Sequence, residues 1–330
     1  RGSGGPHSMT LPVTYGCFTV TLRPEQALAL PPYPGSMFRG AFGWALQHVV
    51  CVTRTHDCPP CLLKERCVFP YVFDTPPPPE TRIMRKYPAA PHPFVLEPPF
   101  PGGVSVAAGQ PVRLGLTVIG KALQYLPYLV FAFERLGQTG LGPARVRCAV
   151  ETVEAALDGH RYVLYDATDR SLRATEPFTQ VASLALGPPE LPGTRGEVGR
   201  LSMEIQTPVR IVYEERLAHT LEFHVLVRNL LRRVAHLSYF HCAGDPSIVA
   251  FREWIELAKG VRTVSHTLRW YDWERYSGRQ QTRMSLGGML GGVTYEGDVA
   301  PFLSLLRVGE ALHVGKGASF GLGRYRIRES

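Results

Sequence analysis

Apolar residues in the first half of the chain recur with the periods of strands and helices. Alternation of apolar and polar residues predicts strands over 13–22, 112–119 and 145–153. Apolar positions at helical spacing predict a helix over 37–50, beginning after Ser36, and another over 121–136 that Pro127 should distort. The stretch 76–101 is so rich in proline that no regular helix is expected there.

A similar succession of elements follows the Pro- and Gly-rich segment 187–199, which we interpret as a domain boundary. Strands are predicted over 201–212, 263–273, 281–295 and 324–328, and helices over 219–242 and 299–306. Each half also ends in a GLG turn that leads into a basic strand, GLGPARVR at 140–147 and GLGRYRIR at 321–328. The shared order strand–helix–strand–strand–helix–strand is that of the ferredoxin-like unit.

The sequence therefore predicts an α+β protein of two tandem ferredoxin-like domains. We assign residues 9–190 to the N-terminal domain and 200–330 to the C-terminal domain, which carries a glycine-rich loop. Residues 1–8, RGSGGPHS, are interpreted as the remnant of an expression tag ahead of Met9.

The charge of the chain points to an anionic partner. Basic residues number 36 against 28 acidic ones, for a net charge of +8 over 330 residues, and 31 of the basic residues are arginine. Arginine suits bidentate phosphate contacts, although a GC-rich genome would explain its excess equally well. No apolar run approaches the length of a membrane helix and no secretory leader is apparent, so we expect a cytoplasmic protein with no membrane partner.

Four cysteines give the most specific spacing in the chain. Cys51, Cys58, Cys61 and Cys67 form a C-x6-C-x2-C-x5-C pattern within an expected insertion, 51–75, after the first helix. Four thiolates can complete a tetrahedral site, and in a cytosolic chain a metal explains them better than disulfides. We expect a structural zinc, with a [4Fe–4S] cluster as the alternative that spacing does not exclude.

Two segments carry residue types that suit RNA. In GKGASFGLG (315–323), glycines would let backbone amides approach a phosphate, which makes Gly315, Lys316, Gly317 and Ser319 candidate RNA contacts. Between the predicted strands near the C-terminus, aromatic residues interleave with arginines, and the candidates there are Arg275, Arg279, Gln280 and Arg283. The alternatives are a tight helix-to-strand connection and a strand with solvated arginines. Motifs of hydrolases, zinc proteases, dinucleotide-binding proteins and two-metal nucleases are missing from the sequence.

The segments 270–297 and 312–327, together with FRGAFGWAL at 38–46 and the four cysteines, resemble the CRISPR repeat-cleaving endoribonucleases of the RAMP superfamily, in particular their cysteine-bearing branch. The resemblance implies that a cleft between the two domains binds the repeat hairpin of a precursor transcript and cuts it into guide RNAs. It implies a cut without a metal cofactor, which leaves 2′,3′-cyclic phosphate and 5′-hydroxyl ends.

The resemblance also implies a histidine near the first helix, and His48 stands at that place, with His56 and His313 as alternatives. Tyr33 would position the sugar or phosphate, and Arg39 would offset charge on the phosphorane. A rival function within the same superfamily is a non-catalytic subunit that binds guide RNA beside other CRISPR effector subunits. A zinc-stabilised protein-interaction module is a third, and it leaves the basic glycine loop unexplained.

Overall fold

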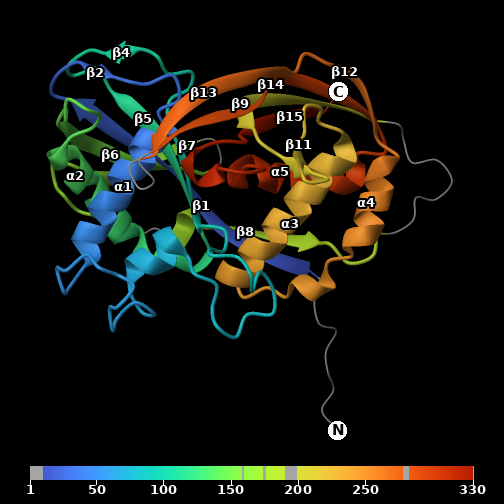
Figure 1. Ribbon diagram of the computed structural model, residues 1–330, viewed down its shortest axis with the longest axis horizontal. Coiled ribbons are helices and arrows are strands. Elements are labelled where there is room, and N and C mark those ends of the chain that lie inside the picture. Colours follow the sequence, from blue (N-terminus) through green and yellow to red (C-terminus); the bar gives the residue numbers. More distant parts are fainter. Residues whose placement is uncertain (1–9, 158–159, 174–175, 190–198, 278–281, 330) are drawn as a thin grey trace, which may run out of the picture.

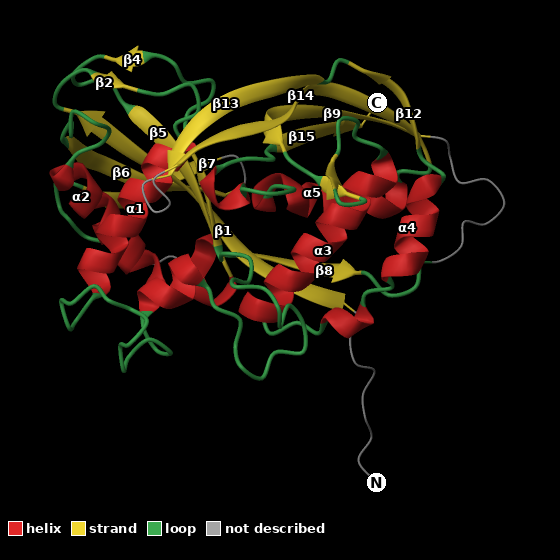
Figure 2. Ribbon diagram, viewed as in Figure 1, coloured by secondary structure: helices red, strands yellow, loops and turns green. Residues whose placement is uncertain are grey.

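A computed structural model of the chain describes residues 10–157, 160–173, 176–189, 199–277 and 282–329. Two antiparallel sheets lie side by side, and helices cover one face of each (Figures 1 and 2). We call each sheet with its helices a module. There are also two short two-stranded sheets, β2 (Leu28–Ala29) with β4 (Ser105–Val106) and β10 (Val212–Tyr213) with β11 (Arg216–Leu217).

The first module has the ferredoxin-like strand order. Its elements are β1 (Thr10–Pro24), α1 (Gly35–Val50), β3 (Phe94–Glu97), β5 (Val112–Ile119), α2 (Leu126–Thr139) and β6 (Cys148–Leu157), and its sheet runs β3-β5-β1-β6. β7 (His160–Asp166) extends the edge beyond β6, and β8 (Gln180–Ala185) pairs with the start of β1. Pro127 occupies the first turn of α2, where its missing N–H costs nothing, instead of distorting a longer helix.

The second module repeats this order. It contains β9 (Gly199–Val209), α3 (Phe223–His241), α4 (Phe251–Lys259), β12 (Arg262–His266), β13 (Arg269–Ser277), β14 (Thr282–Gly297), α5 (Leu303–Leu312) and β15 (Tyr325–Glu329). The sheet runs β12-β14-β9-β15, with β13 also paired to β14. The predicted tandem ferredoxin-like fold is therefore confirmed. Several elements were not predicted, among them β3, which lies in the proline-rich stretch, the edge strands β7 and β8, and α4, which follows the long helix.

The two modules share part of their cores. The start of β1 buries Leu11 and Val13 in the core of the second module, against α3. Ser238 of α3 donates a hydrogen bond to the Pro12 carbonyl, and Trp254 of α4 donates to the Leu186 carbonyl beyond β8. The boundary predicted near 187–199 thus separates the two sheets, while β1 and β8 fasten the modules together. Across the described ranges, no helix is both long enough and apolar enough to span a bilayer.

Candidate functional site

The glycine loop connects α5 to β15 at the junction of the modules. Gly315, Gly317, Gly321 and Gly323 all have positive φ, between 78° and 93°. A Cβ on Gly323 would lie 1.8 Å from the Val314 carbonyl oxygen, so no other residue fits there without a shift of the loop. The backbone N–H of Lys316 donates to the Arg210 carbonyl at 2.7 Å, which fixes the loop against the end of β9.

Tyr33 anchors this loop to the first module. It is buried, and its hydroxyl donates to the Phe320 carbonyl at 2.8 Å. Burial, followed by the charge of Glu97, raises the pKa of Tyr33 well above its ordinary value. At Gly35, a Cβ would lie 2.1 Å from the same Phe320 oxygen, so the start of α1 packs directly on the loop. The structure thus gives Tyr33 a contact with the loop, and Tyr33 does not line the pocket described next.

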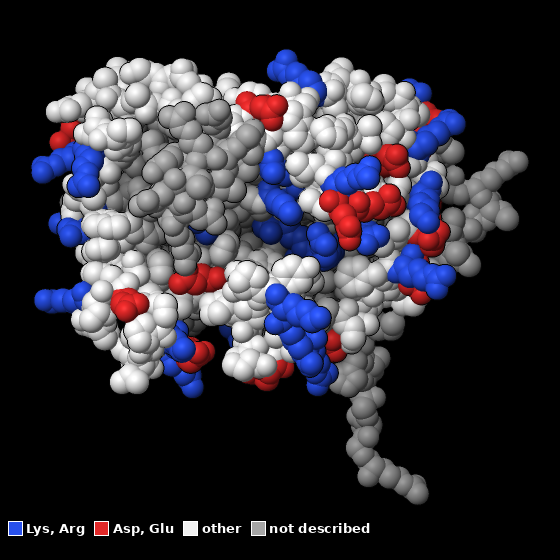
Figure 3. Space-filling view, in the orientation of Figure 1, with Lys and Arg blue, Asp and Glu red and all other residues white. Residues whose placement is uncertain are grey.

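A pocket of about 700 Å³ lies between the modules, beside the glycine loop. We call it the interdomain pocket. Its basic lining residues come from α1, the end of β9, α3 and the loop: Arg39, Arg210, Arg232, Arg233 and Lys316. Two histidines and Asn229 also line it, and none of the described residues in its wall has a carboxylate. Figure 3 shows lysine and arginine side chains gathered in the hollowed middle of this face.

The cations of the interdomain pocket are partly withdrawn from water. Burial lowers the pKa of Arg233 to about 10, and it also lowers the pKa of Arg210, against the opposing effect of the nearby Asp272 carboxylate. Arg233 donates from Nε to the Leu312 carbonyl at 2.7 Å, a neutral partner that does not balance its charge. Grouping such cations without a carboxylate costs free energy unless an anion neutralises them. The pocket is therefore built to receive a negatively charged group.

His92 and His236 are the two histidines in this wall. Burial, and then the charge of Arg232, lower the pKa of His236 to about 4. Burial, and then the neighbouring charges of Arg39 and Arg233, lower the pKa of His92 to about 3. Both rings are therefore neutral near pH 7. His236 belongs to a polar stripe on α3 with Asn229, Arg232 and Arg233 at positions i, i+3, i+4 and i+7, a pattern that sequence reasoning could have singled out.

On its other side, the glycine loop is held by a carboxylate. His313 is fully buried, and its ring contacts the Leu322 carbonyl oxygen through Nδ1 and Glu97 through Nε2, both at 3.1 Å. Arg324 lies 3.2 Å from the second oxygen of Glu97. Burial alone would raise the pKa of Glu97, but His313 and Arg324 hold it below its ordinary value. Because both of its nitrogens already have partners, His313 serves to join the modules.

The structure places His48 at the far end of α1 from the interdomain pocket. Its Nδ1 lies 2.8 Å from the Trp44 carbonyl oxygen, and its ring stacks between those of Trp44 and His56, with centroids 3.8 and 3.9 Å apart. Of the residues proposed for the reaction, only Arg39 lines the pocket. The structure therefore does not bring His48, Tyr33 and Arg39 together at one site.

The four cysteines line one small hollow between the end of α1 and the segment that follows it. Cys61 donates from its backbone to the Cys58 carbonyl at 3.1 Å, which gives the CPPC turn, and all four thiols are free. Across the described ranges, no three His, Cys, Asp or Glu side chains have an arrangement that would hold a metal ion. The expected zinc site is thus unsupported by the arrangement of the thiols.

The predicted RNA contacts divide between two places. Gly315, Lys316, Gly317 and Ser319 line the interdomain pocket. Arg279 and Gln280 lie outside the described residues, and Arg275 and Arg283 stand on β13 and β14 with side chains outside the description. Trp273 of the same hairpin is buried against Tyr33, with ring centroids 5.0 Å apart, so this aromatic residue contributes to packing.

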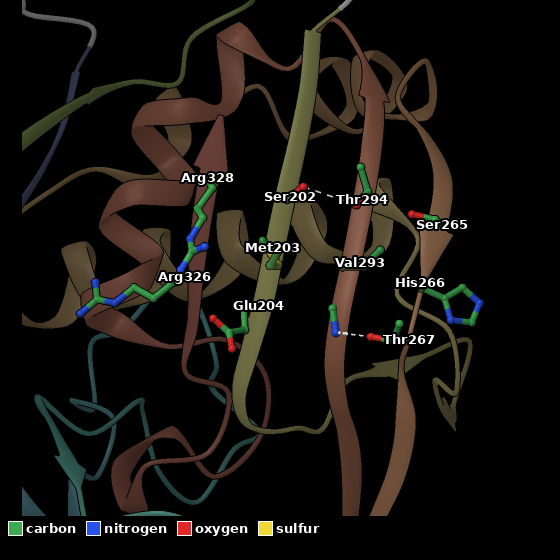
Figure 4. A pocket seen from close by; sticks show the side chains of 11 residues that line it. Ser202, Met203, Glu204, Ser265, His266, Thr267, Val293, Thr294, Arg326 and Arg328 are labelled. Atoms are coloured by element: carbon green, nitrogen blue, oxygen red, sulfur yellow. Dashed lines mark hydrogen bonds between the residues drawn. The ribbon is translucent and has the colours of Figure 1, made fainter. Parts of the chain in front are cut away.

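A second hollow, of about 420 Å³, lies on the open face of the second sheet (Figure 4). Ser202 and Thr294 face each other across β9 and β14, and Arg326 and Arg328 project from β15. Glu204 stands among them, and Arg326 already pairs with Glu310. This hollow therefore mixes both signs of charge, whereas the wall of the interdomain pocket carries only one.

The fold and the basic pocket define a class: a protein with two ferredoxin-like modules and an anion site at the glycine loop between them. Residues 203–325 match the family model of the CRISPR-associated endoribonuclease Cas6, and residues 11–177 match a model named AF_1859_N, an N-terminal domain. The AF_1859_N model covers half of the chain, so the chain belongs to that family, and its C-terminal module is RAMP-like and matches the Cas6 endoribonuclease model. The cysteine-bearing branch is not confirmed by these matches.

The chain is also similar to individual proteins over most of its length. An uncharacterized protein of Archaeoglobus fulgidus is 27% identical over 306 residues, which cover 91% of this chain and 93% of the relative. A Cas6 product complex is 15% identical with a TM-score of 0.55 over 95% of this chain and 100% of the other. Thermus thermophilus Cas6 is 16% identical with a TM-score of 0.52 over 97% and 99%. A chain of a partial Cas6-RT-Cas1–Cas2 complex has a TM-score of 0.56 at 15% identity, over 96% of this chain and 46% of that one.

Proposed function

We propose that the protein binds CRISPR repeat RNA and cleaves precursor transcripts into guide RNAs, with the scissile phosphate in the interdomain pocket. The observation that carries this proposal is the set of basic residues, without a carboxylate among the described lining residues, beside the glycine loop. RNA supplies the missing negative charge through its phosphates. The match of residues 203–325 to the Cas6 endoribonuclease model suggests the class of substrate.

The reaction we propose is attack by the ribose 2′-hydroxyl on the adjacent phosphate. The bond from O2′ to phosphorus forms and the bond from phosphorus to O5′ breaks, which leaves a 2′,3′-cyclic phosphate and a 5′-hydroxyl. One group must accept the proton of the 2′-hydroxyl, and another must give a proton to the departing oxygen. Arg39, Arg233 and Lys316 would stabilise the charge of the phosphorane, so the cut would need no metal ion.

His236 is the side chain in the pocket best suited to take the proton. Its ring is neutral near pH 7 and, within the described ranges, makes no hydrogen bond to another residue. A bound phosphate would offset the charge of Arg232 and so raise the pKa of His236 towards the operating pH. His48 stays the rival candidate, because family resemblance places the histidine near the first helix.

The test is cleavage of labelled repeat RNA from the organism's own array, in EDTA, by the wild type, His236→Ala and His48→Ala. We expect one cut with a cyclic phosphate end, lost in His236→Ala while binding persists, and retained in His48→Ala. Loss in His48→Ala alone would move catalysis to the end of α1. Tight binding with no cut by the wild type would identify a non-catalytic subunit that holds guide RNA among other effector proteins.

We also propose that Cys51, Cys58, Cys61 and Cys67 bind one structural zinc ion. The support is chemical: four free thiols line the same hollow, although binding would have to draw them closer together. Metal analysis of the purified protein should find about one zinc per chain, retained in the control Cys148→Ser and lost in Cys58→Ser. Iron with visible absorption would indicate a cluster instead, and absence of any metal in the wild type would contradict the proposal.

A further inference from the structure

We propose that His92 is a positioning residue, which orients the guanidinium of Arg39 towards the phosphate in the interdomain pocket. The inference rests on the function proposed above. His92 lies in the proline-rich stretch 76–101 and was not among the residues that the sequence singled out. Arg39 lies on α1 and His92 lies just before β3, and both line the pocket.

The contact between the two side chains fixes the protons on the His92 ring. Nη2 of Arg39 lies 3.1 Å from Nε2 of His92. A guanidinium has only donors, so Nε2 must accept and carry no hydrogen. The proton of the neutral ring is then on Nδ1, which lies 2.9 Å from the hydroxyl of Thr75 and donates to it. The Thr75 hydroxyl in turn donates to the Val72 carbonyl at 3.3 Å, so every donor in this series has an acceptor.

Thr75 is held in a conformation that threonine rarely adopts. It is buried, and its φ is +50°, in the left-handed region that disfavours β-branched residues. Its backbone N–H donates to the Pro70 carbonyl at 2.6 Å, and its own carbonyl accepts from the backbone N–H of Ala90 at 2.8 Å. Strain of this kind persists where the surroundings enforce it, often at functional sites. Here it places the acceptor hydroxyl beneath His92.

A second histidine fixes the backbone that carries His92. Nε2 of His241, on α3, donates to the Pro91 carbonyl at 2.8 Å, and Nδ1 accepts from the Tyr71 hydroxyl at 3.1 Å. The His92 ring is thus held by its hydrogen bond to Thr75, and the backbone at Pro91, just before it, is held by His241 of α3. On the opposite side of Arg39, the guanidinium lies 4.2 Å from the centroid of the Phe73 ring. Arg39 is therefore held between Phe73 and His92.

The charges that face His92 keep it in the accepting form. Burial lowers the pKa of His92 most, and the charges of Arg39 on α1 and Arg233 on α3 lower it further, as His241 on α3 does when it is protonated, so that it falls to about 3. A proton on Nε2 would place two cations 3.1 Å apart and release Arg39. Because this needs strong acid, the contact persists across the neutral range, and the orientation of Arg39 does not vary with pH there.

The first test measures the ring protons directly and needs no RNA. In the nitrogen NMR spectrum of the intact protein labelled on histidine, the signals assigned through His92→Gln should show a neutral ring protonated on Nδ1. The Nε2-protonated form, or a charged ring at pH 7, would overturn the proposal. This result stands whether or not the protein cleaves RNA, so it separates the present inference from the proposed function.

The second test is a double-mutant cycle on single-turnover cleavage and on binding of repeat RNA. Glutamine can offer an amide oxygen near the place of Nε2, whereas leucine cannot. We expect His92→Leu to slow cleavage about tenfold, as loss of one charged hydrogen bond would, with Tm kept within a few degrees, and His92→Gln to restore most of the rate. In an Arg39→Ala background, His92→Leu should add almost nothing. An undiminished tenfold loss in that background would show that His92 acts independently of Arg39.

Discussion

The charged residues on the two sides of the glycine loop differ in whether an opposite charge from the chain lies beside them. On one side, His313 and Arg324 both contact the carboxylate of Glu97, which reaches them from the first module. On the other side, Arg39, Arg210, Arg232, Arg233 and Lys316 surround a pocket that has no carboxylate in its described wall. On the first side, the carboxylate of Glu97 provides the opposite charge from within the chain. On the pocket side, an external anion would supply the negative charge that the described lining residues lack.

This difference separates residues that hold the modules together from residues that bind a ligand. Breaking a buried pair leaves an uncompensated charge and destabilises the fold. Removing an exposed pocket cation such as Lys316 should leave stability unchanged and weaken binding of the anion. The two sides should therefore respond to mutation in different measurements.

The largest effect on stability is expected for Glu97→Gln. The substitution removes the counter-charge of His313 and Arg324, and loss of one partner of a buried pair costs about 3–5 kcal/mol. Chemical denaturation measures it. The control is Glu151→Gln, which removes an exposed partner of Arg23 and should cost less than about 1 kcal/mol. Equal effects of the two substitutions would show that the Glu97 pair does not join the modules.

On the pocket side, Lys316→Ala should weaken binding of repeat RNA without changing the free energy of unfolding. Lys316 is exposed on the loop, and loss of one phosphate contact lowers affinity and reduces the slope of binding against salt by about one ion. Lys259→Ala is the matched control, because Lys259 pairs with Glu256 on α4. The comparison fails if both lysines alter the salt dependence alike.

A smaller effect is expected from pH. His236 and His241 have pKa values lowered to about 4, so they stay neutral in the folded protein while the unfolded chain takes up protons below about pH 6.5. The unfolded state then binds more protons, and stability falls as pH decreases from about 6.5 to 4. Thermal unfolding at pH 7.5 and pH 5 should show a lower Tm at pH 5. His241→Gln should reduce this difference, and a Tm that rises at pH 5 would contradict the argument.

The sequence was most informative where a pattern is local. The strand at 112–119 agrees with β5 at both ends, and the repeated GLG turn located the loop that borders the pocket. β3 is only four residues long, and the surrounding prolines obscure it in the sequence. His92 lies just before it and reaches Arg39 across 53 positions of sequence, a contact that no local pattern encodes.

The position of His48 also shows what a local sequence pattern does not predict. Helical spacing placed it correctly on α1, but spacing does not reveal which end of a helix faces a site formed by another module. The pocket lies near Arg39, close to the start of α1, whereas His48 lies in the last turn. The stripe of Asn229, Arg232, Arg233 and His236 was readable along α3. Its importance became clear only when the second module placed that stripe beside the glycine loop.

The most direct test of the account is where the scissile phosphate binds. Repeat RNA with a 2′-deoxy nucleotide at the cleavage site lacks the attacking hydroxyl, so it can be trapped by photocrosslinking and its contacts mapped by mass spectrometry. Crosslinks from the nucleotides that flank that phosphate should fall in peptides containing 229–236 and 315–319. Crosslinks confined to 44–56, or to the open face of the second sheet, would contradict the assignment of the interdomain pocket as the site of cleavage.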